Sequence, residues 1–324
     1  MVGINILSEL ENNLTSRLLR VVEQTAISAA RFRGFGDEVN ADEAAVNAMH
    51  EALGNIAMNG RIIIGEGVEG ECEKLYAGEL IGGGDGPLLS IVVDALEGRT
   101  QCAKALPGAL TTMAVGGEDC FLPVPEVYMD KIAIGAGYPS GTIDLDASPA
   151  DNLKNMAEAK GCKIEDLTVC VLDRPRHGRM IEEVRDAGAA INLIVDGDIA
   201  GVFKTTDPET SGVDMYLGVG GAQEGVLGAA ILKCRGGQMQ GRLKLLVDVH
   251  KERMKASNIE NVDIKYDLDD IVRGDVVLAA AGVTSGWMLG GVQSMGDAVA
   301  TESVIMTSVN KSIRWVTMQT TLES

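Results

Sequence analysis

Five carboxylates of this chain occur where the sequence predicts strand ends or helix starts. Three follow short apolar runs and two lie in the first turn of a predicted helix: Glu66, Asp94 and Glu97, then Asp42 and Glu224. Carboxylates at the ends of strands converge on one edge of a layered sheet, and Mg²⁺ and Mn²⁺ prefer oxygen ligands. The pattern therefore favours a divalent-cation site built from carboxylates.

Each of these acids also has a purely structural interpretation. Asp42 and Glu224 could be ordinary helix-start acids, which the helix dipole favours, and Glu66 lies between two glycines that could form a turn. Asp94 and Glu97 are harder to explain in this way, because burying an unpaired charge directly after an apolar strand is costly. The 3 histidines lack HxxxH spacing, which argues against a histidine-based zinc site.

Two arginines follow another predicted strand, in the segment Arg174-Pro175-Arg176. At a helix start they could bind a phosphate through their charge and their forked donors. They could equally be a solvated surface pair. The neighbouring His177 is interpreted as a capping or surface histidine.

The segment Asp196-Gly197-Asp198 follows the next predicted strand. Its two carboxylates could accept hydrogen bonds from sugar hydroxyls, although a plain turn is the simpler interpretation. Tyr128, in the segment Pro125–Met129, belongs to the same group of candidate contacts for a sugar phosphate.

The elements that position these residues alternate between helix and strand. Apolar periodicity and capping residues predict helices at 8–31, from Asn40 onwards, between Ser148 and Gly161, at 176–187 and at 224–235. Short apolar runs predict strands at 61–64, 88–93, 110–115, 131–134, 167–172, 190–195, 213–217 and 276–281. This mixture indicates α/β or α+β layers. Residues 137–149 are the best candidate for a domain boundary, and residues 236–262 are interpreted as a charged, variable connection.

Composition argues against several classes of protein. The 324 residues carry a formal net charge of −19, which argues against nucleic acid as a partner, since binding its phosphates requires Lys and Arg. Small phosphorylated substrates stay open, because bound cations can reverse the local sign of charge. No apolar run approaches the roughly 20 residues that span a bilayer, so no membrane partner is expected. The absence of a secretory signal pattern and of CxxC spacing among the 6 cysteines predicts a cytoplasmic protein with free thiols.

Nine short motifs occur in order along nearly the whole chain, from about residue 20 to the C-terminal strands. They read ADEAAVNAM, IIIGEG, VDALEG, PEVYMDKIAIG, GTIDLD with ADNLKN, DRPRH, VDGDIA, GVGGAQEGV and AAAGVTSG. In their order and spacing the chain resembles the class II fructose-1,6-bisphosphatases, including the bifunctional fructose-1,6-/sedoheptulose-1,7-bisphosphatases. Each motif alone is weak evidence, whereas nine in order are a strong signal.

The resemblance implies a fold of the α/β class, the layered α/β/α/β/α sandwich of the lithium-sensitive sugar phosphatases. We expect residues 1–145, joined by C-terminal strands at 303–324, to form a metal-binding domain. Residues 146–302 are expected to form a substrate-binding domain. The resemblance also implies a homo-oligomer, a dimer or a tetramer, in the cytoplasm, or in the plastid stroma if the chain is a mature form.

The resemblance further implies hydrolysis of the 1-phosphate of fructose 1,6-bisphosphate with Mg²⁺ or Mn²⁺, and sedoheptulose 1,7-bisphosphate is a further candidate substrate. Asp42 and Glu66 match the family's first metal site, and Asp94, Glu97 and Glu224 match its second. The positions that match substrate contacts are Glu97, Gly98, Tyr128, Arg174, Pro175, Arg176, Asp196, Gly197, Asp198 and Gly221.

The family motif Asp-Pro-x-Glu-Gly-Thr is changed at two positions in this chain. Ala95 stands at the proline and Arg99 at the threonine, with Thr100 one residue later. In the family the threonine hydroxyl helps to position the attacking water, whereas a guanidinium group can only donate. Glu97, Arg99 and Thr100 are therefore the candidate catalytic residues, and Arg99 is expected to depress catalysis without blocking binding.

Two alternative functions stay open. A catalytically weak paralogue could bind sugar phosphates as a regulatory subunit, and Arg99 is the main support for this interpretation. A phosphatase of another phosphomonoester, such as inositol phosphate, would keep the catalysis and change the substrate. The pair Arg174 and Arg176 favours a bisphosphate over that alternative.

Overall fold

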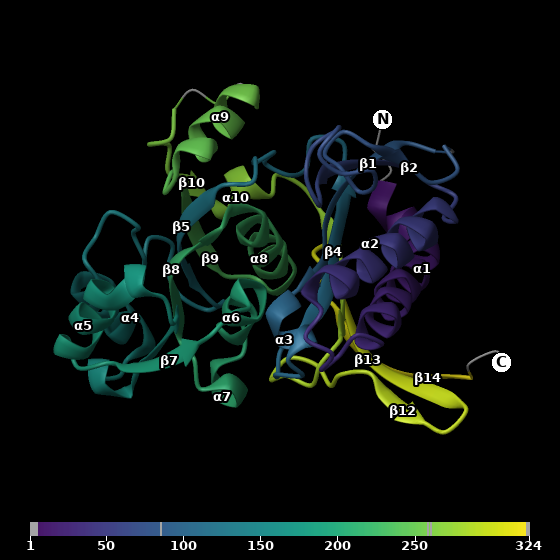
Figure 1. Ribbon diagram of the computed structural model, residues 1–324. Helices are drawn as coiled ribbons and strands as arrows, with labels where there is room; N and C mark the ends of the chain where they lie inside the picture. Colours follow the sequence, from purple (N-terminus) through teal and green to yellow (C-terminus); the bar gives the residue numbers. More distant parts are fainter. Residues whose placement is uncertain (1–5, 85, 258, 260, 322–324) are drawn as a thin grey trace. The chain divides into compact units, whose positions relative to one another are not determined.

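The computed structural model describes residues 6–84, 86–257, 259 and 261–321, and Figure 1 labels its helices and strands. The chain forms two compact units, residues 1–123 with 273–324 and residues 124–272. Each unit contains one β-sheet with helices packed on it, which confirms the predicted α/β class.

The first unit is built on an eight-stranded sheet in the order β12-β13-β11-β4-β3-β1-β2, with β14 paired to β13. Its strands are β1 (Asn59–Ile64), β2 (Leu80–Ile81), β3 (Leu88–Glu97), β4 (Leu110–Gly117), β11 (Val276–Gly282), β12 (Gln293–Met295), β13 (Ala298–Thr307) and β14 (Ile313–Thr321). Its helices are α1 (Ile6–Ala30), α2 (Glu38–Gly54) and α3 (Arg99–Ala103). Only β1 and β3 run parallel to each other among its named strand pairs.

Helices α1 and α2 lie side by side in Figure 1 and contact each other, and both contact the sheet. The core between helices and sheet includes Leu18, Val22 and Met49 from the helices and Ile91 and Met113 from the strands. Burying each such side chain contributes roughly 1.5–3 kcal/mol relative to exposure. Since α2 also contacts α3 and β3, this packing determines where the acid of α2 lies relative to the end of β3.

The second unit is built on a six-stranded sheet in the order β10-β9-β5-β8-β6-β7. Its strands are β5 (Tyr128–Ile134), β6 (Thr168–Leu172), β7 (Ala190–Ile194), β8 (Met215–Gly221), β9 (Gln238–Lys244) and β10 (Tyr266–Asp267). Its α-helices are α4 (Pro149–Lys160), α5 (Gly178–Asp186), α6 (Asp198–Lys204), α7 (Pro208–Ser211), α8 (Ala222–Arg235), α9 (Asp248–Ala256) and α10 (Leu268–Ile271). Two 3₁₀ turns, η1 (Ile164–Asp166) and η2 (Pro175–His177), complete the unit.

Helices pack on both faces of this second sheet. Ile132 and Ile134 of β5 belong to the same buried cluster as side chains of α4 and α5. The alternate residues Met129 and Lys131 instead lie against Gly225 of α8. Because successive side chains of a strand point to opposite faces, α4 and α5 cover one face and α8 the other.

Most predicted elements are confirmed, but two predictions are wrong. Residues 236–262 contain β9 and α9, although they look like a variable connection in sequence. In β9 only every second residue is buried, so its apolar signal is weak. The second helix begins at Glu38, because Asp37 is its N-cap and accepts a hydrogen bond from the Asn40 N–H at 3.0 Å.

The compact units have different limits from the predicted domains, which change at residues 145 and 302. The chain passes from the first unit to the second after Pro123 and returns at Arg273. The physical reason is strand pairing over long sequence distances. Strand β5 pairs along its whole length with β8 and β9, and β11 pairs with β4. Residues 1–5 and 322–324 of the predicted first domain lie outside the described residues.

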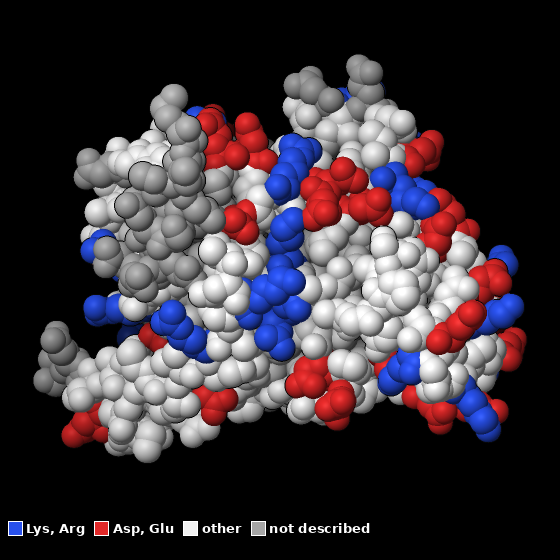
Figure 2. Space-filling view, turned by 180° about the vertical axis from the view of Figure 1, so that it is seen from behind, with Lys and Arg blue, Asp and Glu red and all other residues white. Residues whose placement is uncertain are grey.

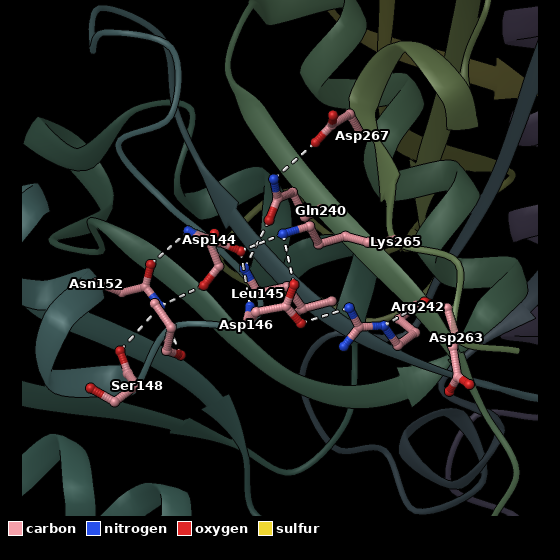
Figure 3. A network of polar contacts seen from close by, with 11 residues as sticks. Asp144, Leu145, Asp146, Ser148, Asn152, Gln240, Arg242, Asp263, Lys265 and Asp267 are labelled. Carbon is pink, nitrogen blue, oxygen red and sulfur yellow. Dashed lines mark hydrogen bonds and ion pairs between the residues drawn. The ribbon is translucent and has the colours of Figure 1, made fainter.

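The segment 137–149 is fixed within the second unit by the polar network drawn in Figure 3. Lys265 Nζ donates to Asp144 at 2.6 Å and to Asp146 at 2.8 Å, and Arg242 Nη2 donates to Asp146 at 2.6 Å. Asn152 Oδ1 accepts from the Asp144 N–H at 2.8 Å. The prediction of a domain boundary in this segment is therefore wrong.

This network predicts an acid-sensitive contribution to stability. Hydrogen bonding to Lys265 lowers the pKa of both Asp144 and Asp146 below 3.8. Their stabilising contribution is therefore complete above about pH 5 and is lost as the pH falls below 3.8. Lys265→Met is expected to lower the Tm at pH 7 by roughly 2 °C, a modest effect because the pairs are solvent-exposed. The difference from the unmodified protein should shrink towards pH 3.

Thermal melts monitored by circular dichroism between pH 3 and pH 7 check this prediction. Lys251→Met is the matched control, because Lys251 forms an exposed pair with Asp248 of the same helix. An equal loss of Tm at pH 3 and pH 7 in Lys265→Met would contradict an ionic origin.

Candidate active site

Two acids of the first unit lie at the same end of neighbouring parallel strands. Ile64 of β1 pairs with Val92 of β3, and Glu66 and Asp94 each follow two residues later. The Ala95 N–H donates to Glu66 Oε1 at 2.9 Å, so Glu66 is bonded directly to the end of β3. The convergence expected from strand polarity therefore occurs within this unit.

Arg99 links two of the predicted metal ligands. Its Nε lies 2.8 Å from Asp42 Oδ1, and its Nη2 donates to Glu66 Oε2 at 3.2 Å. Asp42 belongs to α2 and Arg99 begins α3, so the contact of these helices brings the two side chains together. Burial raises the pKa of the Asp42 carboxyl, and the Arg99 charge opposes that rise.

The candidate catalytic residues lie where β3 turns into α3. Glu97 ends the strand and is buried, after an irregularity in the β3–β4 pairing between Asp94 and Glu97. Gly98 has φ +85°, a conformation that L side chains rarely adopt. Arg99 is then the first helical residue and is exposed, and Thr100 after it is half-buried.

The residues at the end of the first sheet have the right donor chemistry for Mg²⁺ or Mn²⁺ but not the right arrangement. Within the described part of the chain, no three His, Cys, Asp or Glu side chains cluster as a metal site. At Asp42 and Glu66, both carboxylates instead form ion pairs with the Arg99 guanidinium. The first predicted metal pair therefore does not fit an ion while Arg99 is there.

In the second unit, a buried lysine lies beneath two predicted site residues. Lys131 of β5 is fully buried, and its Nζ donates to the Asp198 carboxylate and to the Gly221 carbonyl oxygen. The Tyr216 hydroxyl donates to the other Asp198 oxygen at 2.8 Å. Burial and the Asp198 charge raise the pKa of Tyr216 well above its ordinary value. Both Asp198 oxygens are thus bonded within the protein, and its contact with a sugar stays a prediction.

Glycines at the end of β8 make room for two carboxylates. A Cβ on Gly220 would lie 1.7 Å from Asp198 Oδ2, and a Cβ on Gly221 would lie 1.7 Å from Glu224 Oε2. Only glycine allows the carboxylates to approach the backbone so closely. Burial raises the pKa of Glu224, and the charge of Lys131 opposes this rise.

Arg176 and His177 bond to the carbonyl oxygen and the N–H of the same β8 residue, Val219. Arg176 Nε and Nη2 donate to the Val219 carbonyl oxygen at 3.0 and 2.6 Å. The Val219 N–H donates to His177 Nε2 at 2.9 Å, so His177 Nδ1 carries the proton and donates to the Leu172 oxygen at 2.7 Å. His177 is fully buried, and burial lowers its pKa. His177 is the N-cap residue of α5, although its side chain makes no capping hydrogen bond. Its interpretation as a surface residue is wrong.

The remaining predicted substrate residues of the second unit lie at the ends of β5, β6 and β7. The guanidinium carbon of Arg176 is 5.0 Å from the centre of the Tyr128 ring, a cation–π contact. Tyr128 is opposite Gly221 in the β5–β8 pairing. Arg174 and Asp196 each lie two residues beyond a paired position of β6 and β7, and their nearest charged atoms are 3.6 Å apart. Pro175 begins the turn η2, and Gly197 has φ +94° as the N-cap of α6.

Sequence inspection missed Lys131, Tyr216 and His177 as parts of this arrangement. A lysine inside the apolar strand sequence YMDKIAI was the available signal for Lys131, because lysine is seldom fully buried without a partner. The partner of His177 could not be anticipated, since Val219 is 42 residues away in sequence.

Known proteins similar to this chain were identified by family, sequence and structure. The family model described as bacterial fructose-1,6-bisphosphatase, glpX-encoded, matches residues 12–320. Fructose-1,6-bisphosphatase 1 class 2 of Escherichia coli (strain K12) is 38% identical over 319 residues, 94% of either chain. D-fructose 1,6-bisphosphatase class 2/sedoheptulose 1,7-bisphosphatase of Synechococcus sp. (strain JA-2-3B'a(2-13)) is 36% identical over 332 residues, 95% of either chain.

Among solved structures, the inositol monophosphatase from Anabaena (Nostoc) sp. PCC 7120 aligns with a TM-score of 0.40 and 10% identity, over 78% of this chain and 98% of that one. So low a score supports no statement about function. The family model and the two sequence relatives, in contrast, match nearly the whole chain, and the relatives are 36–38% identical to it. On their strength the chain belongs to the class II fructose-1,6-bisphosphatase family.

Proposed function

We propose that this chain is a phosphatase that removes the 1-phosphate of fructose 1,6-bisphosphate, with sedoheptulose 1,7-bisphosphate as a second substrate. Family membership supports the reaction class. The observation that best supports a bisphosphate is the immobilised Arg176, whose guanidinium is bonded to Val219 and lies against Tyr128. Two of the five guanidinium N–H donors bond to Val219, which leaves three on a fixed cation that could donate to the phosphate that does not react.

Arg174 is proposed to bind the same distal phosphate as Arg176. Its charged atoms are 3.6 Å from Asp196, a loose pair that a phosphate could replace. Binding the distal phosphate at Arg174 and Arg176 would orient the sugar, so a monophosphate should react poorly. Although the net charge is −19, Figure 2 shows Lys and Arg side chains gathered in groups on the visible face, so the surface is not uniformly repulsive to anions.

A divalent cation belongs to the proposal as well, with Mg²⁺ or Mn²⁺ as the candidates. Such an ion neutralises phosphoryl oxygens and makes a bound water more acidic. Asp94, Glu97 and Glu224 are the proposed ligands, since Asp42 and Glu66 bond to Arg99. Glu97 is also the candidate partner for the attacking water, because Arg99 can only donate.

A second candidate function has one specific observation in its favour. Arg99 stands where the family has its threonine, so the chain could be a catalytically weak paralogue that binds sugar phosphates as a regulatory subunit. Another phosphomonoester, such as inositol phosphate, has no second phosphate for Arg174 and Arg176 to bind, so this pair does not favour that activity. Homo-oligomerisation and a cytoplasmic or stromal location stay predictions.

No helix in the described residues has the length and apolar character needed to cross a bilayer.

The phosphate-binding role predicts a specific kinetic effect. Arg174→Ala and Arg176→Ala should each raise the KM for fructose 1,6-bisphosphate about ten- to hundredfold, because losing a charge-assisted contact costs roughly 1.5–3 kcal/mol. The Tm should fall more in Arg176→Ala, since Arg176 also bonds to Val219. Steady-state phosphate release measures the effect. Arg179→Ala is the control, because Arg179 is 91% exposed, and an unchanged KM in both test variants would make these arginines plain surface residues.

The cation-binding role predicts loss of activity without loss of fold. Asp94→Asn should lower kcat about 100-fold or more, since even residues that only support a metal ligand are worth 10–100-fold. EDTA should abolish phosphate release, and Mg²⁺ or Mn²⁺ should restore it. Full activity after exhaustive chelation, or near-normal turnover by both Asp94→Asn and Glu97→Gln, would mean that these acids are structural.

A further inference from the structure

We propose that Arg99 acts as a built-in cation at Asp42 and Glu66 and competes there with a divalent metal ion. The inference rests on the proposed function only in taking the protein to bind a divalent cation; Asp42 and Glu66 are the pair that matches the family's first metal site. One guanidinium contacts carboxylates from two elements, at 2.8 and 3.2 Å. A metal ion shared by the two acids would occupy this same bridging position.

Arg99 brings a positive charge to two largely buried carboxylates. Side chains of Asp42 and Glu66 are only 20% and 10% exposed. Arginine stays protonated at every accessible pH. Because it is covalently attached, it is present at the acids at a high effective concentration, and a free ion must displace it.

Both departures from the family motif act on the same carboxylate. Arg99 donates to Glu66 Oε2, and the Ala95 N–H donates to Glu66 Oε1 at 2.9 Å. The family's proline at the Ala95 position has no N–H to give. The proline-to-alanine change therefore adds an N–H donor to Glu66 Oε1, and the threonine-to-arginine change adds a permanently charged donor to Glu66 Oε2. These two hydrogen bonds to Glu66 are evidence separate from the contact of Arg99 with Asp42.

The competition is reversible rather than absolute. The Arg99 side chain is 53% exposed, so it can swing into solvent without disturbing the core. A divalent metal ion should then bind Asp42 and Glu66 only weakly, because its binding must first break both contacts of Arg99. Removing the guanidinium should convert Asp42 and Glu66 from an arginine-bound pair into a metal-binding pair.

Mn²⁺ binding to chelator-treated full chain, followed by calorimetry and by electron paramagnetic resonance, tests the inference. Arg99→Thr is expected to bind one more Mn²⁺ per chain than the unmodified protein, or to bind its weakest ion at least about tenfold tighter. Arg99→Gln, which keeps much of the side-chain stem, should change in the same direction. Arg179→Thr is the matched control and should bind Mn²⁺ like the unmodified protein, because Arg179 is 91% exposed and pairs with Glu183 of its own helix.

A second substitution locates the additional ion. Arg99→Thr with Asp42→Asn should return the Mn²⁺ count and affinity to those of the unmodified protein. Mn²⁺ should also raise the Tm of Arg99→Thr more than that of the unmodified chain, since an ion that binds the folded state stabilises it.

Equal Mn²⁺ number and affinity in the unmodified protein, Arg99→Thr and Arg99→Gln would overturn the inference, as would the absence of Mn²⁺ binding in all three. These outcomes differ from failure of the proposed phosphatase activity. Additional Mn²⁺ in Arg99→Thr, without hydrolysis by any variant, would support the built-in cation and reject the enzyme.

Discussion

The placement of carboxylates in this chain depends on cationic side chains that lie against them. Lys131 is fully buried and bonds to Asp198, and Arg99 bonds to both Asp42 and Glu66. An uncompensated buried charge is expensive, and removing one partner of a buried pair is strongly destabilising. Lys131 therefore stabilises the fold, and both cations decide which carboxylates are open to an ion or a substrate.

Backbone geometry brings these groups to strand ends in both units. In each unit, side chains two residues beyond paired positions of neighbouring parallel strands interact with the adjoining strand end or with each other, as with Arg174 and Asp196. In the second unit, the Val219 peptide is bonded at its oxygen by Arg176 and at its N–H by His177. Arg176, the proposed phosphate contact, is thereby held by backbone and not by flexible partners, an arrangement that reduces the entropy lost on binding a ligand.

Local signals predicted much of the fold, and long-range contacts explain the rest. Ser148, Pro149 and Gly161 mark the limits of α4 because capping and left-handed geometry are properties of a few adjacent residues. The extent of the units follows instead from β5 pairing with β8 and β9, which adjacent residues do not reveal. The candidate acids were recognisable from their positions at strand ends and helix starts. Their pairing with Arg99 was not, because Arg99 is 57 residues from Asp42 and 33 from Glu66 in sequence.

The central claim is that this chain hydrolyses a sugar bisphosphate held by its distal phosphate. The most direct measurement is phosphate release by the purified protein, with Mg²⁺ and with Mn²⁺, from fructose 1,6-bisphosphate, sedoheptulose 1,7-bisphosphate, fructose 6-phosphate and inositol 1-phosphate. The account predicts a kcat/KM for the bisphosphates at least about tenfold above that for either monophosphate, the lower limit expected from one charge-assisted contact. Preference for inositol 1-phosphate, or no release from any substrate with either ion, would contradict it.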